Sequence, residues 1–143
     1  MGHNNPWQFS TLIRLLDDAR NDLFVHIDKK STSFPMNIFM NLTQASRLVL
    51  LPRKECRWAE FSQVEVEMDL LQEAAQNGAY DYYHLLSGHD LPLKTQDEIH
   101  AFFDAHVQEE FVGYFGGVKR IMTAMSTIVI LFLSATNSEI LVC

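Results

Sequence analysis

The chain has 143 residues, a length that fits one domain, and its hydrophobic fraction of 48% excludes a disordered chain. A formal net charge of −7 argues against a general nucleic-acid binder. Two cysteines do not make a disulfide framework, and no group of Cys and His has the spacing of a zinc site. We therefore expect a globular domain whose partners do not include nucleic acid or zinc.

The first part of the chain predicts a helix followed by a short strand. Asn5-Pro6 has the form of an N-cap and a first helical residue, and the helix should end near Asp18. A turn is expected at Asn21-Asp22, and residues 23–27 then form an apolar strand. The predicted buried face of the helix carries Leu12, Leu15 and Leu16.

A second strand and a second helix follow. A helix or loop spans residues 35–44, and residues 47–51 form a strand that Pro52 closes. Residues 62–65 have the form of a capping box, which predicts a helix that begins there and ends near Gly78. The apolar face of this helix is expected to carry Val64, Met68, Leu71 and Ala75.

The third strand, residues 80–86, is rich in aromatic and apolar residues and is predicted to be buried on both faces. It ends at a polar turn, residues 87–90. Residues 95–98 form a second capping box, so a helix is expected to begin there. Residues 111–114 are consistent with one more strand. The buried side of the last helix is predicted to carry Ile99, Phe102 and Phe103.

Strands that alternate with helices predict an open α/β sheet with parallel pairs. Ligands of such sheets bind beyond the carboxyl ends of the strands, which places Ser87, Gly88, His89 and Asp90 at a site. Gly88 would let a ligand approach the backbone, and Asp90 could accept hydrogen bonds from ligand hydroxyls. An ordinary strand-to-helix turn explains the same residues, and the pattern alone leaves both interpretations open.

Two further groups of residues suggest a nucleotide site. Asp28 ends the first strand, in the position of the acid that bonds a ribose in nucleotide-binding βαβ units, and Lys29 and Lys30 could neutralise phosphate. Arg57 could meet phosphate, and Trp58 could stack on a base or sugar ring. The alternatives are a solvated charge cluster and a core tryptophan beside a surface arginine. The glycine-rich dinucleotide fingerprint and an Asp-x-Asp metal clamp are both absent from the sequence.

The last part of the chain differs in character. Residues 121–138 carry no charge, and their length just reaches the ~18 residues of a membrane-span candidate. Only residues 128–133 are strongly apolar, because threonine, serine and asparagine dilute the rest. A buried strand, or a tail foreign to the domain, explains this segment better than a span.

Three sequence blocks occur in an order and spacing that is more specific than any one of them. They are HNNP with FVHIDKKS after it, RWAEFSQVE, and YYHLLSGHDLPLKTQDEI. Together they resemble the Core-2/I-branching β-1,6-N-acetylglucosaminyltransferase family, glycosyltransferase family 14, which also holds the peptide O-xylosyltransferases. The likeness covers about residues 3–112 and is greatest to the bacterial branch.

The resemblance implies a GT-A-like domain that binds a UDP-sugar, with UDP-GlcNAc as the expected donor. The implied reaction transfers the sugar to a hydroxyl of a glycan acceptor with inversion, without a metal or another cofactor. The positions that match the family blocks imply a donor site of ten residues. They are His3 and Asn4 under the nucleotide, Asp28 and Lys29 at the uridine or ribose, Arg57, Trp58 and Ser62 in the pocket wall, and Ser87, Gly88 and Asp90 at the donor sugar.

The sequence departs from the family pattern at both ends, so we expect a fragment with little or no activity of its own. Only two residues precede His3, where family members have a strand. The family's general base and UDP-binding cations lie downstream of the matching blocks, so no catalytic residue is assigned. We expect residues 1–115 to be a partial donor-binding domain and residues 116–143 to be an apolar tail unlike the family.

No signal peptide is visible at the amino terminus, and the bacterial likeness implies a cytoplasmic location or peripheral association with the cytoplasmic membrane. Two other functions stay open. One is a peptide O-xylosyltransferase-like enzyme, and the other is an inactive module that binds a nucleotide sugar or another partner.

Overall fold

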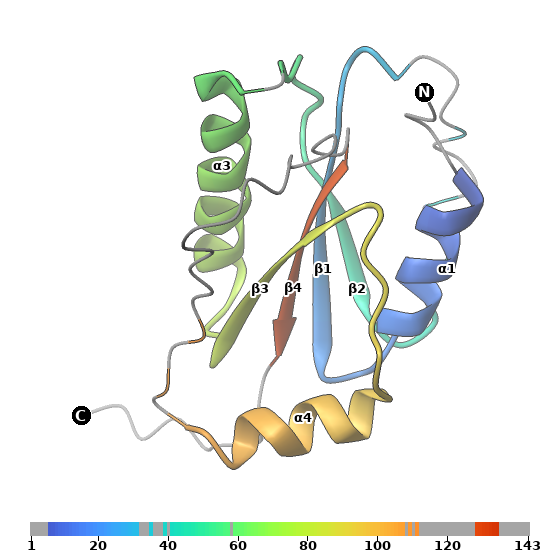
Figure 1. Cartoon of the computed structure of the whole chain (residues 1–143), viewed down its shortest axis with the longest axis vertical. Helices are drawn as coiled ribbons and strands as arrows, with labels where there is room; N and C mark the ends of the chain where they lie inside the picture. Colours follow the sequence, from blue (N-terminus) through green and yellow to red (C-terminus); the bar gives the residue numbers. More distant parts are fainter. Residues whose placement is uncertain are drawn as a thin grey trace, which may run out of the picture.

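The computed structural model describes residues 6–31, 35, 39, 41–57, 59–107, 109 and 111, and the strand backbone of residues 128–134. A four-stranded sheet lies between α1 and α3, and α4 crosses one end of it (Figure 1). The helices are α1 (Pro6–Leu16), α3 (Phe61–Asn77) and α4 (Gln96–Asp104), and the strands are β1 (Asn21–Ile27), β2 (Arg47–Leu50), β3 (Tyr82–Ser87) and β4 (Ile128–Ser134).

The sheet has the order β2-β1-β4-β3. β1 and β2 are parallel, and β4 is antiparallel to both β1 and β3, so β3 runs parallel to β1. The strands β1, β2 and β3 therefore end on the same side, which we call the carboxyl edge (residues 28–31, 51–57 and 87–90). The predicted α/β sheet with a parallel pair is confirmed. It is consistent with the incomplete GT-A-like fold that the resemblance implied.

The first predicted helix is confirmed as α1. Leu12 and Leu16 are buried as expected, but Leu15 is 45% exposed. The apolar stripe of α1 runs instead through Phe9 and Ile13, which are also buried. The predicted face was therefore correct at two of its three leucines.

Side chains of β1 alternate between two cores, as successive residues of a strand must. Leu23, Val25 and Ile27 pack with the buried face of α1, and Phe24 packs with α3. β1 is thus covered on both faces by helices, which explains why Leu23, Phe24, Val25 and Ile27 are all apolar.

The turn expected at Asn21-Asp22 is wrong, because β1 already begins at Asn21 and the turn lies at Ala19-Arg20. Asn21 is buried, and its side-chain amide donates to the Leu16 carbonyl (2.9 Å) and to Oε1 of Gln96 (2.8 Å). These two hydrogen bonds give the N–H donors of the buried amide their partners. Asn21, a residue type that is common in turns, can therefore begin a strand here.

α3 begins differently from the prediction. Its N-cap is Glu60, and no side chain caps the helix, so the capping box expected at residues 62–65 is wrong. Ser62 Oγ instead accepts a hydrogen bond from the backbone N–H of Arg57 (2.9 Å). The end of the helix at Gly78 is confirmed.

The buried face of α3 also differs from the prediction. Val66, Leu70 and Ala74 pack against the sheet. The four residues predicted to be buried form a second apolar stripe, and all of them are exposed to solvent: Val64 (46%), Met68 (59%), Leu71 (38%) and Ala75.

The predicted capping box at the start of α4 is confirmed. Thr95 Oγ1 accepts from the Glu98 N–H (3.3 Å), and the Glu98 carboxylate accepts from the Thr95 N–H (3.0 Å). The predicted buried side is right only in part, because Phe102 is 46% exposed and His100 is buried in its place.

The third predicted strand is confirmed as β3, but it is not buried on both faces. Tyr83 is 42% exposed and Leu85 is 52% exposed. β3 is an edge strand, and α3 packs mainly over β1 and β4, so the α3-side face of β3 is left partly open.

The uncharged segment near the carboxyl terminus contributes a strand. Residues 128–134 form β4, which lies between β1 and β3 in Figure 1, so the strand alternative is confirmed for them. The rest of residues 121–138 lies outside the described part, as do residues 112–114 of the possible strand at 111–114 and residues 36–38 and 40 of the segment at 35–44. Among the helices described, none is long and apolar enough to cross a membrane. The domain boundary at residue 115 stays a prediction.

Candidate functional site

The topology brings the predicted site segments to the carboxyl edge. Ile27 pairs with Ile128, and Ser87 pairs with Val129, so the ends of β1 and β3 flank the first residues of β4. Adjacent strands lie ~4.8 Å apart, which puts these two ends roughly 10 Å apart. That span is short enough for one nucleotide-sized ligand to reach both segments.

Asp28 follows β1 and is only 3% exposed. Its Oδ1 accepts from the Lys30 N–H (2.8 Å), and its carbonyl accepts from the Ser31 N–H (3.0 Å), so Asp28 closes a tight turn. The Lys30 ammonium lies 3.5 Å from Oδ2 and donates to the Cys56 carbonyl. The carboxylate predicted to meet the nucleotide therefore also shapes the turn, and Lys30 stands beside it.

The segments after β1 and β2 are joined by several hydrogen bonds. The Lys54 N–H donates to Nε2 of His26 (2.9 Å), and the Lys29 N–H donates to the Lys54 carbonyl (3.0 Å). Arg53 donates from its guanidinium to carbonyls of the turn after β1. The two segments therefore form one connected unit at the edge of the sheet.

His26 lies at the base of this unit and is 2% exposed. Burial lowers the pKa of His26, and the nearby Asp28 carboxylate opposes that shift. Because Nε2 accepts a hydrogen bond, the neutral ring is the form that fits. Burial also raises the pKa of Cys56, and Asp28 acts in the same direction, so this thiol stays protonated near neutral pH.

The predicted pocket-wall residues are only partly described. Arg57 is exposed and has a weak ion pair with Glu55 (Nε to Oε1, 3.4 Å). Ser62 lies in the first turn of α3 and binds the Arg57 backbone. His3, Asn4 and Trp58 lie outside the described residues.

The segment after β3 forms a closed turn. The Ser87 N–H donates to the Asp90 carboxylate (2.6 Å), and the Asp90 N–H donates to the Ser87 carbonyl (3.0 Å). Gly88 is buried, whereas Asp90 is exposed. The Gln8 side chain of α1 binds the carbonyl of His89 (2.7 Å) and holds the turn against the first helix. One carboxylate oxygen of Asp90 is thus committed to the turn, and the other has no hydrogen bond to a described residue.

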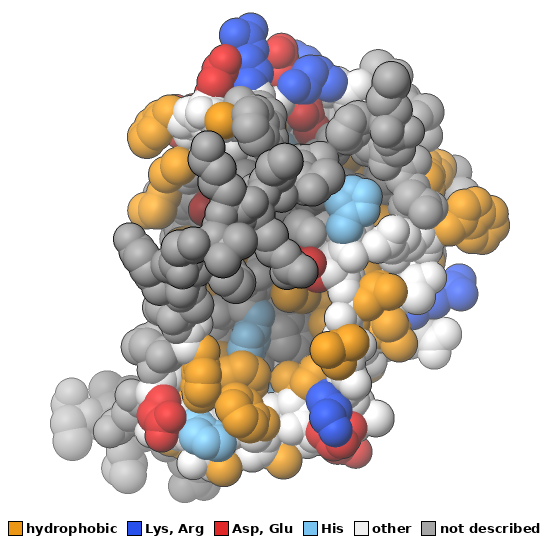
Figure 2. Space-filling model, viewed as in Figure 1, with side chains coloured by type: hydrophobic (Ala, Val, Ile, Leu, Met, Phe, Trp, Pro, Cys, Tyr) orange, Lys and Arg blue, Asp and Glu red, His pale blue; other side chains and the backbone are white. Residues whose placement is uncertain are grey.

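Cations gather at the carboxyl edge although the chain as a whole is acidic. Lys29, Lys30, Lys54 and Arg57 are all exposed there. Figure 2 shows basic and acidic side chains together at the top, above the ends of β1 and β2. Lys54 pairs with Asp69, but Lys29 has no ion pair with any described residue. Lys29 is therefore a cation that an anionic ligand could bind without breaking an existing pair.

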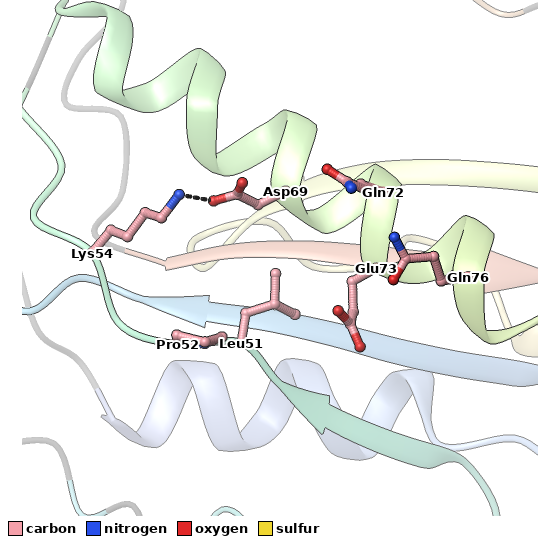
Figure 3. A pocket seen from close by; sticks show the side chains of 7 residues that line it. All are labelled: Leu51, Pro52, Lys54, Asp69, Gln72, Glu73 and Gln76. Atoms are coloured by element: carbon pink, nitrogen blue, oxygen red, sulfur yellow. Dashed lines mark hydrogen bonds and ion pairs between the residues drawn. The ribbon is translucent and has the colours of Figure 1, made fainter.

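A hollow of about 270 Å³ lies beside this edge, between the end of β2 and α3 (Figure 3). Figure 3 shows Leu51 and Pro52 on the sheet side and the polar side chains of α3 opposite them, with the Lys54–Asp69 ion pair at one end. Asp28 and residues 87–90 do not line this hollow. It is therefore a neighbour of the predicted site and does not coincide with it.

The structure thus brings Asp28, Lys29 and Arg57 together on one part of the edge, and the turn at residues 87–90 on another. The sequence interpretation missed Arg53, which organises the first of these parts together with His26. A histidine in an apolar strand, such as His26, is more often a core residue with one satisfied ring nitrogen than a ligand, and His26 is buried with Nε2 bonded. Arg53 gave the signal of a cation directly after the proline that closes a strand, which is where buried backbone carbonyls need donors.

Comparison with known proteins gave one match. The family model described as "Branch: Core-2/I-Branching enzyme" matches residues 2–127, well over half of the chain. This match extends past residue 112, where the likeness based on sequence blocks ended. A search of curated proteins and a search of solved structures each found no match.

Proposed function

Because the chain belongs to the Core-2/I-Branching enzyme family, a family of glycosyltransferases, we propose that its carboxyl edge binds the UDP part of a UDP-sugar donor. The donor sugar is N-acetylglucosamine, and the acceptor is a hydroxyl of a glycan. The turn at Asp28 meets the uridine or ribose, and the turn at residues 87–90 meets the donor sugar. We further propose a cytoplasmic location or peripheral contact with a bacterial cytoplasmic membrane.

The proposed reaction is an inverting transfer without a metal. In such a reaction a carboxylate removes the acceptor proton while the hydroxyl attacks the anomeric carbon, and positive charge stabilises the departing UDP. Lysine and arginine side chains can supply that charge in place of a divalent cation. We assign the general base to no residue of this chain, so the test of the proposal is donor binding.

One observation carries the proposal. β1 and β3 end on the same side, and the exposed Lys29 is free of ion pairs with described residues beside the buried Asp28. A basic side chain next to a carboxylate is a combination that suits a nucleoside diphosphate, because the ligand carries both phosphate acceptors and ribose hydroxyl donors.

Calorimetric titration of the full chain with UDP tests the proposal. We expect UDP and UDP-GlcNAc to bind, and we expect EDTA to leave both affinities unchanged. Lys29→Ala should weaken UDP binding about tenfold, since hydrogen bonds to charged groups contribute about 1.5–3 kcal/mol. The control is Lys94→Ala, which removes an exposed lysine paired with Glu98 at the other end of the molecule.

The outcomes separate the possible functions. If neither UDP nor UDP-GlcNAc binds, the proposed donor site is wrong. Tighter binding of UDP-xylose than of UDP-GlcNAc would identify the donor sugar as xylose. Binding of UDP with equal affinity by Lys29→Ala would remove Lys29 from the site and leave the family function in place.

A further inference from the structure

Arg53 binds the turn after β1 through several hydrogen bonds, although the sequence predicted no role for it. Nη2 of its guanidinium donates to the carbonyls of Asp28 (2.6 Å) and Ser31 (2.5 Å) and lies 3.4 Å from that of Lys29. Nε donates to the carbonyl of Ile27 (3.3 Å). One side chain from the segment after β2 therefore holds the whole turn that follows β1.

These contacts suit an arginine specifically. A planar guanidinium presents several N–H donors in a fixed fork, whereas a lysine ammonium is a compact point charge on a flexible stem. Arg53 is partly buried, and no ion pair joins it to an acidic side chain in the described part of the chain. Within the described part, the groups that its guanidinium binds are backbone carbonyl oxygens.

The carbonyls that Arg53 binds matter for an anionic ligand. Four carbonyl oxygens that converge on one place carry partial negative charge, which would repel a diphosphate at this edge. The Arg53 cation offsets that charge. It also fixes the backbone of the turn from which Lys29 and Lys30 project.

We infer that Arg53 is a positioning residue for the donor diphosphate: it orients the turn at residues 28–31 so that Lys29 faces the phosphates. This inference rests on the proposed donor site. Arg53 contacts the turn and not the donor, so its loss should weaken UDP binding through Lys29.

The test compares Arg53→Ala and Arg53→Lys with the wild-type full chain. UDP affinity, measured by calorimetry, should fall about tenfold or more in both variants, because lysine keeps the charge but cannot reproduce the fork. Arg47→Ala is the matched control. Arg47 also makes several bonds, to Asp22 and Tyr80, but it lies at the opposite end of β2 and should not affect UDP affinity.

Two readouts distinguish positioning from a general loss of stability. Hydrogen exchange of the Lys30 and Ser31 amides, both bonded within the turn, should accelerate in ligand-free Arg53→Ala and not in Arg47→Ala. Millimolar guanidinium should restore part of the UDP affinity of Arg53→Ala, compared with sodium at equal ionic strength. A merely destabilised protein would not be rescued by a denaturant.

Each outcome has a defined meaning. Equal UDP affinity of Arg53→Lys and wild type, or unchanged exchange of both amides in Arg53→Ala, overturns the inference while the donor site stands. If the wild-type chain binds no UDP, the proposed function fails and the donor role of Arg53 fails with it.

Discussion

His84 should make the protein less stable in mild acid. It lies in β3, where its ring is 4.4 Å from that of Phe103 in α4 and 6.2 Å from that of Tyr82, measured between centroids. Burial lowers the pKa of His84 to about 4, and the nearby His100 acts in the same direction. The folded protein therefore holds His84 neutral under conditions in which the unfolded chain would protonate it.

The direction of the pH effect follows from these two pKa values. A histidine in the unfolded chain has a pKa near 6.5, so below that pH the unfolded state takes up a proton that the folded state refuses. Stability is therefore fully present above pH ~6.5 and is lost as the pH falls toward the folded pKa of about 4. Between pH 7 and pH 5 the free energy of unfolding should fall by about 2 kcal/mol from this one group.

Urea unfolding of the wild type and of His84→Phe at pH 7 and pH 5 measures the effect. The substitution keeps an aromatic ring beside Phe103 and removes the titration. His26 and His100, whose pKa values burial also lowers, are present in both proteins, so their contributions cancel. The wild type should lose about 2 kcal/mol more than the variant over this pH range. Equal losses in the two proteins would refute the reasoning.

Three further predictions concern stability, each measured by urea or thermal unfolding. Thr95→Ala removes a complete capping box from α4 and should cost about 1 kcal/mol, and an unchanged midpoint would contradict that role. Leu70→Ala should lower the free energy of unfolding by about 2–5 kcal/mol because Leu70 is fully buried. Leu71→Ala, at a 38% exposed position, should lower it by less than ~1 kcal/mol. The reverse order would refute the assigned face of α3. A chain that stops at residue 127 should lose cooperative unfolding because β1 and β3 would both lose their β4 partner, and a wild-type transition would exclude β4 from the sheet.

Local sequence signals were sufficient for most helices and strands. The capping box at Thr95 was predictable because both partners, Thr95 and Glu98, are close in sequence and bond each other. The strand before Asp28 was predictable because burial on both faces demands a continuous apolar run. Such features depend on a few consecutive residues and not on the rest of the fold.

The buried face of α3 could not be predicted in the same way. α3 carries two apolar stripes, one through Leu70 and one through Met68, and both have helical spacing. Which stripe meets the sheet depends on where the helix is anchored after β2, and that is a property of tertiary structure. The sequence contains the pattern twice and gives no local reason to choose.

One half of the candidate site depends on contacts between neighbouring segments of the sequence, and the other half depends on the tertiary structure. Asp28, Lys29 and Arg53 are brought together by β1 and its sequence neighbour β2, so this half of the site forms within residues 21–57. The turn at residues 87–90 reaches the same edge only because β4 lies antiparallel between β1 and β3. A change that opens the β3–β4 pairing and keeps the β1–β4 pairing should therefore separate the proposed donor-sugar turn from the nucleotide turn while leaving the Arg53 contacts intact. UDP binding should then survive better than discrimination between UDP-sugars, which is the order of loss expected if the two halves have different structural origins.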